Sequence, residues 1–290
     1  MQPRVANSAR KLTPEHQTYY QERGYYFPVR VFGEEEAAGF KNSFQEYLDR
    51  YAEQLSRLLP RDRRIYLTET HLFLPWVYQI ISHPPVLDAV ESVLGPNILV
   101  WGSQWFPKLP GDKAYVSWHQ DGTYWGLQPP NVTTAWIALS ASTIENGCMR
   151  VVPRTHLSAV LPQRETYAPD NMLSRGQEIA VDVDEAQAVD LVLRPGEMSL
   201  HHIGTVHGSG PNNSRGPRIG LAVRYISPDV VQAGAARDLA MLVRGKDDYG
   251  HFDLVNPPDH ASSPEESALH AEALRRKGSN ILPQDYPSPK

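Results

Sequence analysis

The chain has 290 residues and carries 28 Lys and Arg against 33 Asp and Glu, which gives a formal net charge of -5. This balance creates no general attraction to nucleic acid or to an anionic membrane, so we expect neither as a partner. Cys148 is the single cysteine, which excludes an internal disulfide and a cysteine-based metal site.

The sequence has no run of about 18 apolar residues that would indicate a membrane helix. Residues 1–8 lack the apolar stretch of a secretory signal, so we expect a cytoplasmic protein. The 25 prolines and 20 glycines accompany a hydrophobic content of 41%, which favours a turn-rich β protein around a well-filled core. The sequence gives no indication of the oligomeric state.

Two amphipathic helices are predicted in the N-terminal third. Apolar residues recur at three- and four-residue intervals over residues 33–59, and three glutamates at positions 34–36 suit the positive end of the helix dipole. A second apolar stripe covers residues 85–94 and stops at Gly95 and Pro96. We therefore expect residues 13–95 to be a mainly helical part of the protein.

Beyond Pro96 the chain changes to short apolar runs between turn residues, a pattern typical of strands in a sandwich or barrel. The expected strands cover residues 98–106, 115–119, 133–139, 149–152, 189–193, 198–203 and 219–226. We expect a barrel core over residues 97–228, then helices and loops over residues 229–290, within one catalytic domain of residues 1–290. The polar stretch 163–190 is expected to be a crossover or a lid over the cavity mouth.

His119 and Asp121 stand two residues apart in the segment Ser-Trp-His-Gln-Asp-Gly at positions 117–122. Because side chains alternate along a strand, both would point to the same side and could hold one metal ion. His207 is our candidate for a third ligand. Two histidines and one carboxylate form the set that leaves coordination positions open on non-heme Fe(II) oxygenases.

Three segments carry a wider pattern: SWHQDGTYW at 117–125, ENGCMRVVPRTH at 145–156 and HGSGPN at 207–212, with Arg218 eleven residues after His207. In this order and spacing they resemble the phytanoyl-CoA dioxygenase (PhyH) family of Fe(II)/2-oxoglutarate oxygenases. The resemblance implies a β-rich α+β fold, with a double-stranded β-helix (a jelly roll or cupin-like barrel) flanked by N-terminal and C-terminal helices.

The resemblance also implies cofactors and roles. Fe(II) would be bound by His119, Asp121 and His207, with 2-oxoglutarate and dioxygen as cosubstrates. Arg218 would hold the distal carboxylate of 2-oxoglutarate, and a guanidinium group suits that task because it can donate two parallel hydrogen bonds to a carboxylate. The further cosubstrate contacts expected are Ser209, which shares a strand face with His207, and Gln104 and Trp136.

The implied reaction is hydroxylation of an aliphatic carbon, with release of succinate and CO2. Asp121 favours hydroxylation over halogenation, since related halogenases replace this carboxylate with a small residue that makes room for chloride. Residues 123–127 look more like the bacterial small-molecule branch of the family, so we expect a small metabolite or a natural-product intermediate as substrate. The residues expected near that substrate are Tyr124, Trp125, His71, Trp101, Asn131 and His202.

Other interpretations of the same residues stay open at this point. His119 and Asp121 could be a structural hydrogen-bonded pair, Arg218 could form a core salt bridge, and His202 could take the place of His207. At the level of the whole protein, the alternatives are a cupin-type metalloenzyme that does not use 2-oxoglutarate and a noncatalytic barrel that binds a small molecule.

Overall fold

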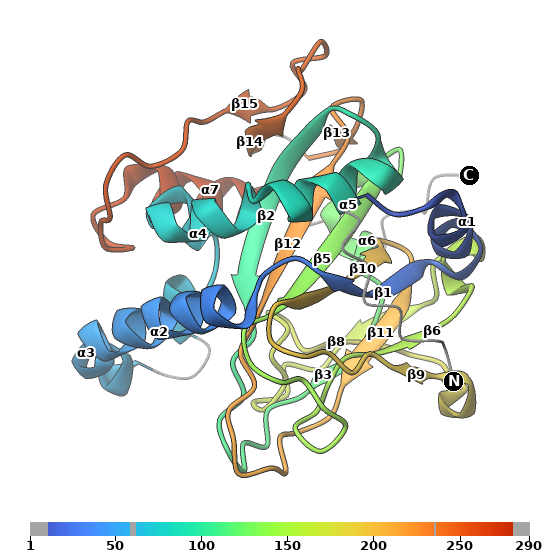
Figure 1. The fold of residues 1–290 in the computed structure, drawn as a ribbon, viewed down its shortest axis with the longest axis horizontal. Coiled ribbons are helices and arrows are strands. Elements are labelled where there is room, and N and C mark those ends of the chain that lie inside the picture. Colours follow the sequence, from blue (N-terminus) through green and yellow to red (C-terminus); the bar gives the residue numbers. More distant parts are fainter. Residues whose placement is uncertain (1–10, 59–61, 235, 281–290) are drawn as a thin grey trace.

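The computed structural model describes residues 11–58, 62–234 and 236–280, and two β-sheets form its centre (Figure 1). The larger sheet has the strand order β1 (Tyr25–Arg30), β10 (Glu197–His202), β5 (Val132–Ala138), β12 (Gly220–Ile226), β2 (Ile98–Trp105), β14 (Leu239–Arg244) and β15 (Asp253–Leu254). The smaller sheet has the order β3 (Val116–His119), β11 (Val206–Ser209), β6 (Arg150–Val152) and β9 (Val189–Asp190). Residues 1–10 and 281–290, which are the two ends of the predicted domain and include residues 1–8, lie outside the described residues.

The remaining elements are short hairpins and helices. Two strand pairs stand apart from the main sheets, β13 (Val231–Gln232) with β4 (Leu127–Gln128) and β7 (Gln163–Glu165) with β8 (Gln177–Ile179). The helices are α1 (Pro14–Arg23), α2 (Glu34–Arg50), α3 (Ala52–Arg57), α4 (Pro75–Ile81), α5 (Pro84–Leu94), α6 (Gly122–Trp125) and α7 (Ala268–Asn280). Single 3₁₀ turns are η1 (Asp62–Tyr66), η2 (Thr70–Leu72), η3 (Thr155–Leu157) and η4 (Glu185–Gln187).

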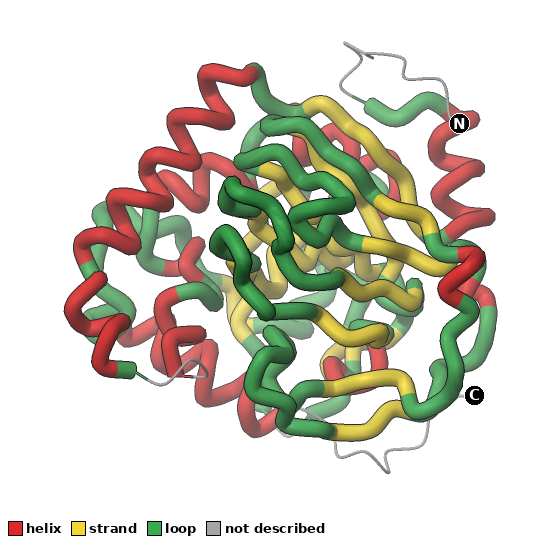
Figure 2. The backbone as a smooth tube through the Cα atoms, turned by 90° about the horizontal axis from the view of Figure 1, so that it is seen from below, coloured by secondary structure: helices red, strands yellow, loops and turns green. Residues whose placement is uncertain are grey.

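Helices cover one face of the larger sheet, and the other face looks toward the smaller sheet. Figure 2 shows the strands in the middle of the molecule with helices on its flanks. Phe44 of α2 stacks on Trp105 of β2, with ring centroids 4.3 Å apart. Along β5, Ala135 and Ile137 belong to the core beneath the helices, whereas Trp136 packs in a second cluster. Strand alternation therefore turns Trp136 away from the helices and toward the space between the sheets.

The predicted helices are found, with shifted limits. The helix expected over residues 33–59 is divided into α2 and α3, because Tyr51 leaves helical geometry at φ -106° and ψ 16°. The helix expected over residues 85–94 is α5, which begins one residue earlier at Pro84, where a proline is compatible with the first helical turn.

The larger sheet extends beyond the predicted barrel core of residues 97–228. β1 lies in the part that we expected to be mainly helical, and β14 and β15 lie in the part expected to be helix and loop. β1 contains Pro28, which cannot donate to a ladder, and the strand accordingly lies at the sheet edge. The apolar run of β14 does not alternate, so its sequence does not separate a strand from a helix.

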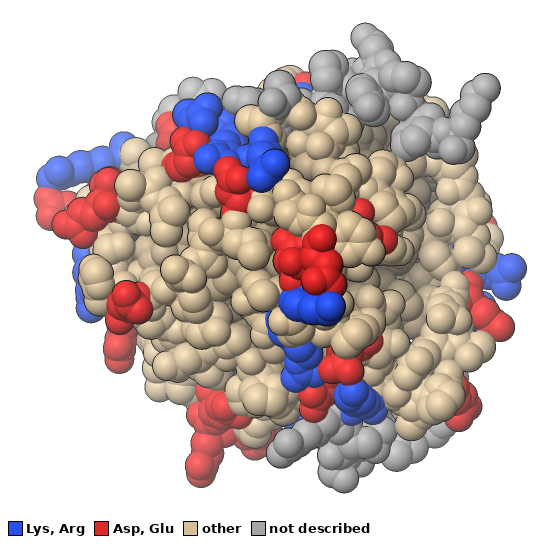
Figure 3. Space-filling model, turned by 90° about the horizontal axis from the view of Figure 1, so that it is seen from above, with Lys and Arg blue, Asp and Glu red and all other residues tan. Residues whose placement is uncertain are grey.

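The surface carries charges of both signs. On the face shown in Figure 3, Lys and Arg side chains lie close to Asp and Glu side chains over several elements. Ion pairs such as Arg276 with Glu272 (2.7 Å) and Arg244 with Asp88 (2.8 Å) belong to this pattern of neighbouring opposite charges. None of the helices in the described part of the chain has the length and apolar character that crossing a bilayer requires.

The packing of β12 against β5 generates the first prediction. A Cβ atom at Gly220 would overlap the ring of Trp136, so Gly220→Ala should lower the free energy of unfolding by about 1–3 kcal/mol, as overpacking does. Gly39, in the middle of α2, has nothing within 4 Å of such an atom. Gly39→Ala should therefore raise the free energy of unfolding by about 0.5–1 kcal/mol. Urea unfolding of both variants measures the two changes, and changes of equal sign and size would contradict the prediction.

Candidate active site

The pairing of the smaller sheet brings two histidines together. In the antiparallel pair of β3 and β11, His119 lies directly opposite His207, and their ring centroids are 4.1 Å apart. Asp121 follows β3 at the start of α6, with a helical backbone conformation (φ -57°, ψ -40°). The expectation that Asp121 continues the strand was wrong, but the turn still brings its carboxylate to the histidines. One ligand atom from each of these three residues lies within 4.8 Å of the others.

Backbone carbonyl groups orient both histidine rings. Nδ1 of His119 lies 2.9 Å from the carbonyl oxygen of Ser117, and Nδ1 of His207 lies 3.0 Å from that of Thr205. A carbonyl oxygen only accepts, so Nδ1 must carry the hydrogen in each ring. The lone pair of each Nε2 is then available for a metal, the arrangement that ligating histidines ordinarily show.

The charge state of the three residues also suits a metal. Burial lowers the pKa of His207 well below its usual value, which keeps the imidazole neutral. Burial alone would raise the pKa of the Asp121 carboxyl, but the surrounding imidazoles hold it well below the usual range. A neutral imidazole and an ionised carboxylate are the forms that bind a metal, so these residues fit the Fe(II) ligand set expected from the sequence.

Two further side chains contact the Asp121 carboxylate, and sequence reasoning missed both in this role. Thr134 donates to Oδ2 of Asp121 at 3.3 Å, and Nε2 of His201 lies 3.7 Å from the same oxygen. Of the adjacent pair on β10, His201 faces the metal site. His202 lines neither described cavity; its ring lies beside that of His156, with centroids 5.2 Å apart, and accepts a hydrogen bond from the Gly204 N–H.

A cavity of about 50 Å³ adjoins the three candidate ligands, and side chains from both sheets line it. Arg218 lies buried in its wall and donates to the backbone carbonyls of Gly147 and Phe106. The guanidinium carbon lies 5.3 Å from the ring centroid of Trp136, which lines the same cavity. The described residues offer Arg218 no carboxylate partner, and its Nε has no hydrogen-bond acceptor. The core salt bridge considered for Arg218 is therefore not present.

Lys108 is a second buried basic residue beside Arg218. The two residues exchange backbone hydrogen bonds of 2.8 and 2.9 Å, and the Lys108 amino group donates to the Ser209 hydroxyl at 2.7 Å and to the Gly210 carbonyl. Ser209 thus accepts from Lys108, which leaves its own hydroxyl hydrogen free to be donated. Burial, with the nearby charge of Arg218, lowers the pKa of Lys108 to about 6. In the sequence, only the apolar residues and prolines on either side of Lys108 could have indicated that this lysine is buried.

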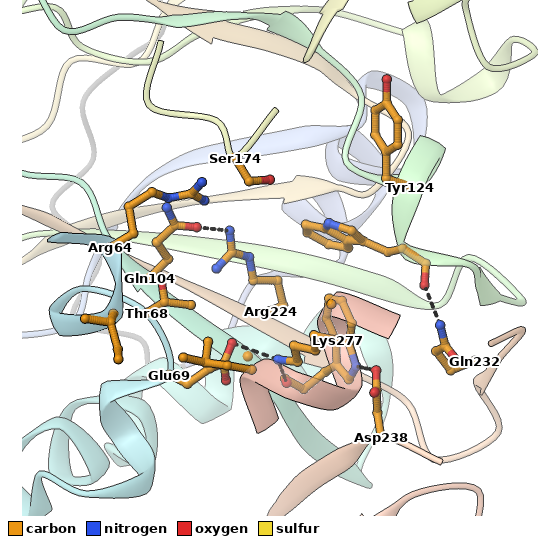
Figure 4. A pocket seen from close by; sticks show the side chains of 16 residues that line it. Arg64, Thr68, Glu69, Gln104, Tyr124, Ser174, Arg224, Gln232, Asp238 and Lys277 are labelled. Atoms are coloured by element: carbon orange, nitrogen blue, oxygen red, sulfur yellow. Dashed lines mark hydrogen bonds and ion pairs between the residues drawn. The ribbon is translucent and has the colours of Figure 1, made fainter. Parts of the chain in front are cut away.

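A larger cavity of about 370 Å³ lies next to the first, and Arg224 lines both (Figure 4). Four of the residues singled out in the sequence line this larger cavity: Trp101, Gln104, Tyr124 and Trp125. Gln104 faces Arg224, which donates to its side-chain oxygen at 3.3 Å. The expectation that Gln104 contacts the cosubstrate receives no support from this position. From the expected lid, Leu173 lines the smaller cavity and Ser174 the larger one.

Two other substrate candidates lie elsewhere. His71 is buried in η2 and bonds to the Ser103 hydroxyl at 2.8 Å, outside the lining of both cavities. Asn131 is exposed and donates to the carboxylate of Asp229 at 2.9 Å. Neither position supports the expected contact with substrate, because sequence proximity to the predicted strands did not reveal which way each side chain points.

Comparisons with known proteins agree with this geometry. The phytanoyl-CoA dioxygenase (PhyH) family matches residues 20–220. The human peroxisomal phytanoyl-CoA dioxygenase is 26% identical over 237 residues, which are 75% of this chain and 69% of the relative. A Stutzerimonas stutzeri protein described as a "Probable alpha-ketoglutarate-dependent hypophosphite dioxygenase" is 31% identical over 163 residues, 55% of this chain and 56% of its own.

Among solved structures, the apo form of the non-heme monooxygenase ThoJ is 34% identical, with a TM-score of 0.79 over 91% of this chain and 96% of its own. The match of the family to more than half of the chain agrees with the double-stranded β-helix and with the His-Asp-His cluster. The chain therefore belongs to the phytanoyl-CoA dioxygenase (PhyH) family and is a 2-oxoglutarate-dependent non-heme iron dioxygenase.

Proposed function

We propose that the enzyme hydroxylates an aliphatic carbon of a small metabolite or natural-product intermediate. In the overall reaction, 2-oxoglutarate and dioxygen would convert a C–H bond to C–OH and yield succinate and CO2. The observation that carries this proposal is the buried set of His119, Asp121 and His207 beside a cavity with an unpaired cation, Arg218.

Each residue at the centre has a role in this proposal. His119 and His207 would bind Fe(II) through Nε2, held in place by their carbonyl partners, and Asp121 would bind it through a carboxylate oxygen. Thr134 would steady the other carboxylate oxygen. When bound, Fe(II) with 2-oxoglutarate and dioxygen supplies the oxidising chemistry, while the protein fixes the geometry and keeps water out.

Arg218 and Ser209 would hold the distal carboxylate of 2-oxoglutarate. Arg218 has a free Nε, and Ser209 has a hydroxyl hydrogen that its bond with Lys108 leaves available. Lys108 would act as a positioning residue, since it contacts Ser209 and Gly210. The charge of Arg218 would offset the cost of removing the carboxylate from water.

Asp121 favours hydroxylation over halogenation. Because this chain keeps the carboxylate, the metal would have three protein ligands, with no position vacated for chloride. The comparison with ThoJ, which is described as a non-heme monooxygenase, also supports oxygen insertion. One relative of this chain is described as a probable hypophosphite dioxygenase, which is consistent with a small substrate.

Anaerobic addition of Fe(II) and 2-oxoglutarate should give the visible charge-transfer absorption of a chelated 2-oxo acid. His119→Ala and His207→Ala should lose the band, since each removes an imidazole ligand. His202→Ala is the matched control, because it removes a mostly buried histidine outside both cavities and should keep the band. Retention of the band in the ligand variants would refute the assignment.

Arg218→Ala should raise the KM for 2-oxoglutarate about 30-fold or more, because losing a buried charged partner costs about 2 kcal/mol or more. Arg164→Ala serves as the control, since Arg164 is exposed and pairs with Glu178 at 2.5 Å away from the cavities. Steady-state rates of succinate formation give the KM for 2-oxoglutarate of each variant. An unchanged KM in the Arg218 variant would show that the distal carboxylate binds elsewhere.

A screen of candidate metabolites should find compounds that stimulate succinate release. Under isotopically labelled dioxygen, one labelled oxygen should enter the product and one should enter succinate. Mass spectrometry of both products tests the reaction type. A product that has lost two hydrogens without gaining oxygen would identify a desaturase instead.

A further inference from the structure

The larger cavity contains an uneven distribution of charge. Three cationic residues line it, Arg64, Arg224 and Lys277, together with the acidic residues Glu69 and Asp238 (Figure 4). Both acids already have partners. Glu69 pairs with Lys277 at 2.7 Å, and Asp238 accepts from the indole N–H of Trp101 at 2.9 Å.

The two arginines have no such partner. Within the described part of the chain, neither Arg64 nor Arg224 forms an ion pair, and Nε of each is buried without a hydrogen-bond acceptor. Arg224 donates a side-chain hydrogen bond to the neutral amide of Gln104. In Figure 4, Arg64, Gln104 and Arg224 lie next to one another. Two guanidinium groups thus share one wall of the cavity without a counter-ion.

Physical chemistry makes this arrangement costly in an empty site. Burial, together with the charge of Arg224, lowers the pKa of Arg64 to about 10. Burial also lowers the pKa of Arg224, and the carboxylates of Asp121 and Glu69 act on it in the opposite direction from beyond ion-pair distance. Glu69 is already paired with Lys277, and Asp121 would be engaged by the metal. An anion that enters the cavity would relieve the cost, because a partly buried charge that has lost water gains from a partner of opposite charge.

The rest of the wall indicates what the anion is attached to. Trp101 and Trp125 lie with ring centroids 5.1 Å apart, and the guanidinium carbon of Arg224 lies 5.4 Å from the Trp125 ring centroid. Aromatic faces provide apolar contact area, so the cavity combines an apolar surface with two unpaired cations. Since Arg224 also lines the metal cavity, a group bound to it would lie close to the iron ligands.

We propose that Arg64 and Arg224 bind the anionic group of the substrate, a carboxylate, phosphate or phosphonate, and thereby determine which carbon faces the metal. This inference rests on the proposed function and narrows its substrate class to small organic anions with an apolar portion. Guanidinium groups suit all three anions, because their N–H pairs match the spacing of the anionic oxygens.

Isothermal titration calorimetry can test the inference with defined probes. The protein is saturated with Fe(II) and 2-oxoglutarate under argon, then titrated with benzoate, phenylphosphonate, phenyl phosphate or the uncharged benzamide. At least one anion should bind, and benzamide should bind about tenfold more weakly or worse, the difference expected for loss of a charge-assisted hydrogen bond. Arg64→Gln and Arg224→Gln should each weaken anion binding about tenfold, while Arg164→Gln should leave it unchanged.

Several outcomes would overturn the inference. One is equal affinity for benzamide and the anions. The others are unchanged anion binding in both glutamine variants and no binding of any anion to the wild-type protein. A higher dissociation constant for 2-oxoglutarate in the two variants, with unchanged probe binding, would assign the arginines to the cosubstrate. If the wild-type protein shows no charge-transfer band with Fe(II) and 2-oxoglutarate, the proposed function fails, and anion binding to this cavity is then judged by calorimetry alone. Arg64→Gln keeps the test valid if Arg224→Gln does not fold.

Discussion

The site depends on the register between β3 and β11. This pairing places His119 opposite His207, and a shift by one residue would turn one imidazole to the other face of the sheet. Each ring is also held from within its own segment, because its Nδ1 donates to a carbonyl two residues earlier in the chain. Asp121 then needs only one turn beyond β3 to complete the set, so a local strand pairing organises residues that lie 88 positions apart in the sequence.

Two arginines without carboxylate partners, the buried Arg218 and the partly buried Arg224, lie beside this centre. Arg218 lines the small cavity, and Arg224 lines both that cavity and the larger one. An unpaired buried charge is costly, so such groups usually persist where a ligand supplies the opposite charge. The proposed 2-oxoglutarate carboxylate accounts for Arg218. The proposed substrate anion accounts for Arg224. 2-Oxoglutarate and the substrate would then bind to different arginines beside the metal centre.

The sequence predicted the class of fold and the cluster of His119, Asp121 and His207, because short motifs in a fixed order carried that information. It did not predict the orientation of single side chains. His201 and His202 are adjacent, and only the pairing of β10 with β5 decides which one faces the metal. Lys108 meets Ser209 across 101 positions of sequence. Such long-range contacts follow from topology and leave no local pattern.

A crystal structure of the protein with Fe(II) and 2-oxoglutarate, prepared without oxygen, tests the central claim most directly. We expect the metal to bind Nε2 of His119, Nε2 of His207 and the carboxylate of Asp121. We also expect the distal carboxylate of 2-oxoglutarate to contact Arg218 and Ser209. A metal held by other residues, or a distal carboxylate bound between Arg64 and Arg224, would contradict it.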